Sequence, residues 1–213
     1  MEQINEKAFL ITAGVLVGLE LASNVLHGLP LARELSPLIW TGMVRCLDLV
    51  LFFSLFRALS VPLSVAGLRK PIKGFLTGLG GSVVLGSGFF LFLYAARVLG
   101  GVDLRAYVNP GVRVRGIIPL AVLSLIGPFV EEIFFRGLCY RLIRAHGGVL
   151  LSVILSAILF GMSHLLSAGT LAVVFVPLVG GIIFALLYEY TGSLYAPFIL
   201  HATANFILFS RII

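Results

Sequence analysis

Long stretches without charge restrict the fold of this chain more than any other feature. From Gly147 to Leu187 the only ionisable side chain is that of His164, and Gly116–Val130 carries no charge. A helix of about 20 apolar residues is enough to cross the hydrocarbon core of a membrane. Charged residues are 11% of the chain, whereas soluble domains carry about 25%. The sequence therefore predicts an integral membrane protein with lipid as its solvent.

The apolar runs predict an all-α, polytopic membrane helix bundle of about seven to eight transmembrane helices. A break at Ser167–Thr170 divides the long run Gly147–Leu187 into two spans, and Pro119 and Pro128 could divide another span, giving eight. The expected spans are Phe9–Leu29, Leu38–Val61, Gly74–Ala96, Gly116–Arg144, the two within Gly147–Leu187, and Tyr195–Ser210. Because no long linker interrupts the chain, we expect residues 1–213 to form one domain, with front helices in 1–99 and every motif discussed below in 116–210.

The third predicted helix carries a stripe of small residues. Gly74, Gly78, Ser82 and Gly86 recur every four positions, so they lie on one helical face. Small residues at this spacing let a second helix approach closely. We interpret the stripe as a packing seam.

The formal net charge of +6 comes from short basic groups scattered over the predicted loops. Basic residues that flank apolar helices anchor a protein at the membrane surface, and no basic segment here is typical of a nucleic-acid site. We therefore expect the lipid bilayer as a partner and no nucleic acid. A multi-pass protein of this kind would lie in the cytoplasmic membrane if its host is bacterial.

Glu131, Glu132 and Arg136 place two carboxylates and a guanidinium beside an uncharged run. A charge at bilayer depth costs at least about 2.5–3.5 kcal/mol, so such groups are functional candidates. Glu132 and Arg136 stand four residues apart, which is the spacing of a helical ion pair, and Glu131 is rotated about 100° away around the axis. We expect Arg136 to neutralise Glu132 and Glu131 to point elsewhere. The structural alternative is a charge cluster at a helix end that faces lipid headgroups.

Two further motifs bring histidines into apolar helices: Phe160-x-x-x-His164 and His201-x-x-x-Asn205. Taken singly, each is explained by polar contacts between packed membrane helices. Taken together with the acids, they let three helices direct polar groups at one buried cavity. Carboxylate, imidazole and amide are the groups that hydrolysis needs, as a base for water, a proton shuttle and donors to an oxyanion.

In this order and in successive apolar helices, the three motifs resemble those of the CPBP intramembrane protease family. That family includes the type II CAAX prenyl endopeptidases and the bacterial Abi proteins. The resemblance covers roughly Gly116–Ser210 and does not extend to the first three helices. It implies an intramembrane endopeptidase that hydrolyses a peptide bond of a membrane-associated peptide or protein, either in CAAX-type processing or in removal of a bacterial leader or sorting tail.

The resemblance also implies roles for individual residues. Glu131 would be the general base that activates water, and His164 would position that water. His201 and Asn205 would stabilise the tetrahedral oxyanion. Three further residues would support this site: Glu132, Arg136 and Phe160.

No cofactor is favoured, although zinc is possible because proteins of this family have been described as metalloproteases. If the activity depended on zinc, Glu131, His164 and His201 would be its ligands. The chain has no His-Glu-x-x-His, and its two candidate histidines lie on different helices. These features favour a glutamate mechanism over a zinc metalloprotease.

Two other classes of function remain open at this point. A non-catalytic membrane scaffold or immunity protein could use a protease-like fold to bind a partner. A transporter could use Glu20, Arg45 and Asp48 of the front helices, although Arg45 and Asp48 are spaced to pair on their own helix.

Overall fold

The computed structural model describes residues 4–27, 36–101, 114, 116–168 and 172–210, and every regular element in these ranges is helical. The elements are α1 (Glu6–His27), α3 (Pro37–Ala58), a 3-10 turn η1 (Leu63–Ala66), α4 (Pro71–Gly100), α6 (Ile117–Ala121), η2 (Val122–Ile126), α7 (Gly127–Glu132), η3 (Ile133–Tyr140), α8 (Arg141–Ala168), α9 (Ala172–Thr191) and α10 (Tyr195–Ser210). The predicted all-α class is confirmed.

Five helical stretches in the described residues are long and apolar enough to cross a membrane: Glu6–His27, Pro37–Ala58, Leu63–Gly100, Ile117–His164 and Val174–Thr191. Tyr195–Ser210 is a shorter apolar helix. Gly148 has non-helical backbone angles, φ 72° and ψ −176°, so the 48-residue stretch Ile117–His164 consists of two helices. The span count of seven to eight stays a prediction. The predicted break at Ser167–Thr170 begins two residues too early, because α8 continues through Ser167 and Ala168, and the rest of it lies outside the described residues.

The prolines of the fourth predicted span do not divide it, contrary to the expectation that they could. Pro119 lies in α6 and Pro128 in α7, and the backbone stays helical from Ile117 through Tyr140. The segments η2 and η3 are π-helical, and the Gly127 N–H bonds to the Val122 carbonyl five residues back. A π turn is wider than an α turn, so it gives the Pro128 ring room without ending the helix.

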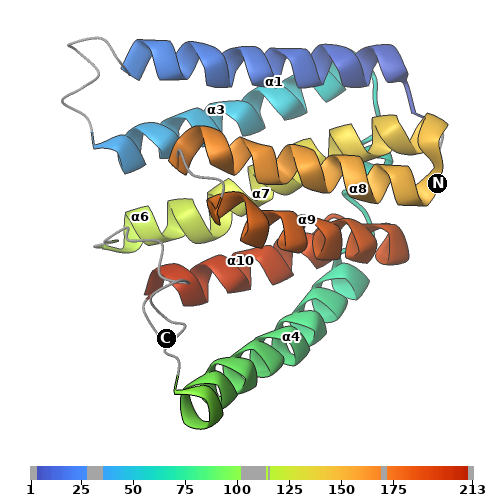
Figure 1. The fold of residues 1–213 in the computed structure, drawn as a ribbon. Coiled ribbons are helices and arrows are strands. Elements are labelled where there is room, and N and C mark those ends of the chain that lie inside the picture. The colour runs from blue at the N-terminus through green and yellow to red at the C-terminus, as the bar shows by residue number, and fades with distance from the viewer. Residues whose placement is uncertain (1–3, 28–35, 102–113, 115, 169–171, 211–213) are drawn as a thin grey trace.

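The bundle has α1 and α3 on one side and α4 on the other. Figure 1 shows α1 and α3 side by side at the top, the α6–α8 stretch and α9 below them, and α4 lying against α10 and extending outward. The main apolar core joins α1 and α3 to η3 and α9 through fully buried side chains that include Phe9, Phe52, Phe56, Leu138 and Tyr188. The front helices therefore pack directly on the segment that carries the charged motif.

A pair of turns links the two halves of the chain. Gly67 and Gly192 both adopt positive φ, 93° and 63°, which favours glycine. The Leu194 N–H donates to the Gly67 carbonyl at 2.9 Å, and Arg69 Nε donates to the Gly192 carbonyl at 2.9 Å. These bonds hold the start of α10 against the loop before α4, and α10 carries His201.

The small-residue stripe of α4 is a packing seam over part of its length. A Cβ added at Gly74 would lie 2.5 Å from Ser193 Oγ, and one added at Gly78 would lie 2.5 Å from the Ala196 carbonyl oxygen. Ser82 is buried, but a Cβ at Gly86 would meet nothing within 4 Å. The prediction of a seam is thus right at Gly74 and Gly78 and wrong at Gly86, where α4 no longer packs against α10.

Gly78→Ala is expected to lower the free energy of unfolding by about 1–3 kcal/mol, the usual cost of overpacking a tight contact. The atom in the way is a backbone carbonyl of α10, which cannot move without moving the helix. Gly86→Ala is the matched control, and it should be neutral or stabilising by up to about 1 kcal/mol because alanine favours helix. Unfolding of both variants in detergent measures the difference. Equal stability of the two would show that the seam does not hold α4 to α10.

Candidate active site

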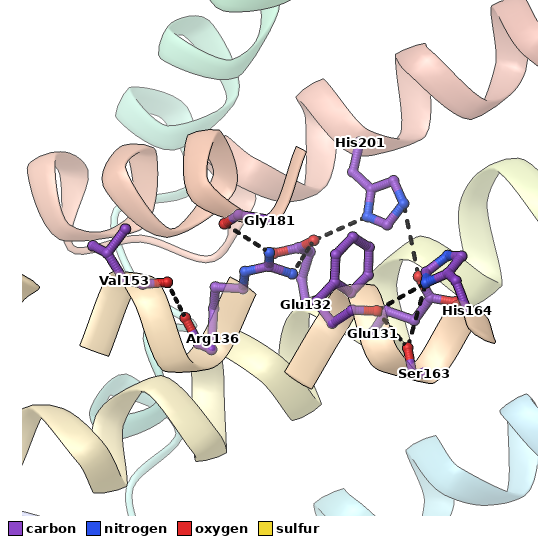
Figure 2. Close-up of polar contacts among 10 residues, drawn as sticks. Glu131, Glu132, Arg136, Val153, Ser163, His164, Gly181 and His201 are labelled. Carbon is purple, nitrogen blue, oxygen red and sulfur yellow. Dashed lines mark hydrogen bonds and ion pairs between the residues drawn. The ribbon is translucent and has the colours of Figure 1, made fainter. Parts of the chain in front are cut away.

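A buried ion pair lies at the junction of α7 and η3. Arg136 Nη1 bonds to Glu132 Oε1 at 2.9 Å, and both side chains are 0% exposed. Arg136 Nη2 also donates to the Gly181 carbonyl of α9 at 3.1 Å (Figure 2). The predicted pairing of Glu132 with Arg136 is confirmed. A buried carboxylate and guanidinium that are hydrogen-bonded to each other avoid most of the cost of an unpaired charge.

His201 of α10 extends this pair to the second glutamate. Its Nδ1 lies 2.9 Å from Glu132 Oε1, and its Nε2 lies 3.7 Å from Glu131 Oε2. Glu132 also accepts from Arg136, so its Oε1 receives two charge-assisted donors. Figure 2 shows the imidazole between the two carboxylates. The structure thus brings His201 to Glu132, 69 positions away in the sequence, and to the adjacent Glu131.

Aromatic rings surround the guanidinium and the imidazole. The Arg136 guanidinium lies 4.7 Å from the centroid of the Phe160 ring and 5.2 Å from that of Phe184, within reach of cation–π attraction. Phe184 also stacks on the His201 ring at 4.7 Å and 20°. Phe160, predicted as a supporting residue, is therefore in direct contact with this charge cluster.

Sequence reasoning missed Phe184 and Gly181. A Cβ at Gly181 would lie 3.0 Å from Ala157 Cα and 3.3 Å from a ring carbon of Phe160, so α9 approaches α8 closely here and exposes its carbonyl to Arg136. A glycine inside an apolar helix often marks such an approach. Phe184 follows Gly181 by three residues and lies on the same helical face. A glycine and an aromatic residue at this spacing are the sequence signal from which both could have been predicted.

His164 lies near the end of α8, with its ring fixed by its own helix. Nδ1 is 2.9 Å from the Phe160 carbonyl oxygen, which can only accept, so Nδ1 carries the proton. In the neutral ring the lone pair is then on Nε2. Ser163 Oγ, which donates to the same carbonyl at 2.7 Å, sits beside the ring.

Asn205, predicted as an oxyanion donor, bonds to a backbone carbonyl of η2. Its Nδ2 donates to the Leu123 carbonyl at 2.9 Å. That carbonyl belongs to the π-helical segment, where the regular hydrogen-bond ladder is altered. One amide N–H of Asn205 is thus used on η2, and its role as an oxyanion donor stays a prediction.

Glu131 and His164 line one cavity of about 580 Å³, between α1, α3, the α7–η3 segment and the end of α8. This volume falls in the range of about 300–1,000 Å³ that is usual for ligand sites. The Glu131 side chain is 22% exposed, whereas Glu132 is 0% exposed. The two neighbouring acids thus differ in their access to a bound molecule, as their helical positions predict.

Glu131, His164 and His201 are the residues that would hold a zinc ion if the activity depended on one. Over the described part of the chain, no group of three or more His, Cys, Asp or Glu side chains is arranged to hold a metal ion. His164 and His201 each use Nδ1 on another group, which leaves Nε2 as the ring nitrogen that a metal would take. Glu131, His164 and His201 do not form such a group of three in the described residues, and no step proposed below passes through a metal.

The front-helix charges pair with one another. Arg45 Nη1 of α3 contacts Glu20 Oε1 of α1 and lies 3.3 Å from Asp48 Oδ2. The expected pairing of Arg45 with Asp48 is confirmed, and Glu20 joins it from the neighbouring helix. All three side chains line the cavity that also holds Glu131.

Comparison with known proteins gave one family match. Residues 113–207 match the family model described as type II CAAX prenyl endopeptidase Rce1-like. The matched range runs from just before α6 into α10 and contains every predicted catalytic and supporting residue, whereas α1, α3 and α4 lie outside it. Comparisons with curated proteins and with solved structures gave no match.

Proposed function

We propose that the chain is an intramembrane endopeptidase whose catalytic base is Glu131, because residues 113–207 match the family model described as type II CAAX prenyl endopeptidase Rce1-like. This match supports the predicted CPBP assignment and a protease that acts on a membrane-associated substrate. The five apolar helical stretches and the family together make it an integral membrane protein.

The observation that carries the proposal is the difference between the two adjacent glutamates. Glu132 is buried and engaged by Arg136 and His201, so it has no access to a substrate. Glu131 faces the cavity and keeps part of its carboxylate exposed. A general base must reach the proton that it removes, and of these two acids Glu131 meets that condition.

In the proposed reaction, water bound between Glu131 and His164 attacks the carbonyl carbon of the scissile peptide bond. Glu131 accepts one proton of that water, and His164 orients the water while its other hydrogen stays on the attacking oxygen. When the tetrahedral intermediate collapses, the C–N bond breaks and Glu131 returns its proton to the leaving amine. The oxygen of the water thus becomes part of the new carboxylate, and the proton that Glu131 took from it goes to the new amine.

His201 is proposed to stabilise the oxyanion through Nε2–H. Because Nδ1 already donates to Glu132, the ring must carry both protons in this role. Two carboxylates, the Arg136 guanidinium and the imidazolium then form a neutral cluster, and preorganised donors of this kind lower the barrier most. Asn205 would contribute its second amide N–H, since one is used on the Leu123 carbonyl.

The proposal is tested by incubating the purified protein, in liposomes, with a farnesylated peptide that ends in a CAAX sequence. Mass spectrometry should find the truncated product with wild type. In parallel, protein termini in host membranes with wild type are compared with those in a strain carrying Glu131→Gln, because the natural substrate could instead bear a leader or sorting tail. Failure of both assays to find a wild-type-dependent cleavage would leave the scaffold hypothesis as the better one.

Removal of divalent metal is expected to leave the cleavage rate within about twofold. The reason is geometric, because no cluster of three metal ligands forms among the described residues. The measurement is the rate before and after dialysis against a chelator, with metal content followed by mass spectrometry. Loss of activity that zinc restores would instead establish a metalloprotease.

A further inference from the structure

The cavity beside Glu131 is built partly by helices that lie outside the family match. Its lining includes Glu20 of α1, Arg45 and Asp48 of α3, and Glu131 and His164 of the matched region. All five side chains thus line one cavity of about 580 Å³. A peptide cut beside Glu131 would therefore place neighbouring side chains against the α1 and α3 charges.

The cavity has an excess of negative charge. Three carboxylates, those of Glu20, Asp48 and Glu131, line it, whereas Arg45 is the one Arg or Lys among the described residues that do so. With its histidines neutral, the lining has a formal charge of −2. Arg45 is already engaged by both Glu20 and Asp48, so little of its charge is left for a ligand. In a poorly screened site, such an excess favours a bound cation and repels an anion.

Asp48 has capacity left for a hydrogen-bond donor. Its side chain is 2% exposed, and its Oδ1 atom has no hydrogen-bond partner among the described residues. A buried carboxylate oxygen without a donor costs free energy that a bound N–H group would recover. Asp48 lines the cavity, so the missing donor can come from a bound molecule.

An aromatic ring and apolar side chains complete this part of the cavity. Trp40 of α3 lines it together with Phe134 of η3. An indole face attracts a cation, and apolar side chains accommodate the methylene stem of a long basic residue. The chemistry of the lining thus fits a long side chain with a positively charged end.

We propose that Glu20, Arg45 and Asp48 form a specificity subsite that takes a lysine or arginine side chain of the peptide substrate close to the scissile bond. Glu20 and Asp48 bind the cationic end, and Arg45 holds the two carboxylates in place from between them. This inference rests on the proposed function, because the cation is placed relative to a peptide that is cut beside Glu131. It adds a selection for basic peptides to that function.

The test is a series of farnesylated peptides that differ at one position. Lysine, norleucine or glutamate is placed in turn at each of the three positions on either side of the scissile bond, and kcat/KM is measured with wild type in liposomes. At one or more positions the lysine peptide should be cleaved about tenfold faster than the norleucine peptide, with the glutamate peptide slowest, as expected for a close charge pair.

Variants of Glu20 and Asp48 then test whether the lysine preference comes from the proposed subsite. Asp48→Asn and Glu20→Gln should each remove most of the lysine advantage, measured as the ratio of kcat/KM for the lysine peptide to kcat/KM for the norleucine peptide. Glu189→Gln is the matched control, because Glu189 is a partly exposed carboxylate bound to Tyr140 and Arg144 away from the cavity. It should keep the full lysine advantage.

The outcomes separate the two proposals. If no peptide in the series and no host membrane protein is cleaved, the proposed endopeptidase function fails. If wild type cleaves the lysine, norleucine and glutamate peptides equally well, the function stands and the subsite is wrong, a result that needs no variant to fold. A lysine preference that survives both Asp48→Asn and Glu20→Gln would likewise overturn the subsite.

Discussion

Glu131→Gln is expected to lower kcat for peptide hydrolysis by about 10²–10⁴-fold, the usual contribution of a general base. Glutamine keeps the size of the side chain and its contact with the cavity, but it cannot accept a proton from water. The Glu132–Arg136 pair does not involve Glu131, so the fold should persist. The measurement is single-turnover cleavage of a substrate found with wild type, together with a detergent unfolding curve for each protein.

Glu189→Gln is a closely matched control for Glu131→Gln. Glu189 is 23% exposed and Glu131 is 22% exposed, and both are carboxylates on helices of the matched region. Glu189 accepts hydrogen bonds from Tyr140 and Arg144 and does not line the cavity. The Glu189→Gln substitution should therefore leave kcat within about threefold. Full cleavage by Glu131→Gln would exclude Glu131 as the base.

Arg136→Met is expected to lower the free energy of unfolding by about 3–5 kcal/mol, because it leaves a buried charge without its main partner. Glu132 is 0% exposed and would keep His201 as a hydrogen-bond partner. The Gly181 carbonyl would lose the donor Nη2 as well. Equilibrium unfolding in detergent measures the loss.

The double variant Glu132→Gln/Arg136→Met separates a charge effect from a packing effect. If the cost of Arg136→Met comes from the stranded carboxylate, neutralising Glu132 should recover about half of it or more, because paired sites are not additive. If the cost comes instead from the contacts of Arg136 with Phe160 and Phe184, the double variant will be at least as unstable as the single one. A loss below about 1 kcal/mol for Arg136→Met would contradict the structural importance of the pair.

Features that depend only on residues close together in the sequence were predictable from the sequence. Apolar runs of span length indicate membrane helices because lipid selects them by composition. The pairing of Glu132 with Arg136, and of Arg45 with Asp48, follows from helical spacing alone. The seam at Gly74 and Gly78 follows from the same periodicity, although nothing in the stripe shows that Gly86 lies beyond the end of the contact with α10.

Features that depend on helix packing were not predictable from these patterns. Pro128 is accommodated by a π-helical turn rather than by a break, and Asn205 lies against the Leu123 carbonyl that belongs to such a turn. Phe184 stacks on His201 from another helix. In each case the partner lies on a distant segment, and short-range periodicity carries no information about which segments meet.

The sequence by itself determined the membrane-helical class, the separate directions of Glu131 and Glu132, and the family resemblance of residues 116–210. Each of these is set within one helix or by the order of short motifs. Only the tertiary structure decided that Glu132 is closed off by Arg136 and His201 while Glu131 faces a cavity. It alone placed Glu20, Arg45 and Asp48 in that same cavity, because their position depends on how α1 and α3 pack against η3. The physical reason is that a cavity is the space left between packed helices, and no single helix contains it.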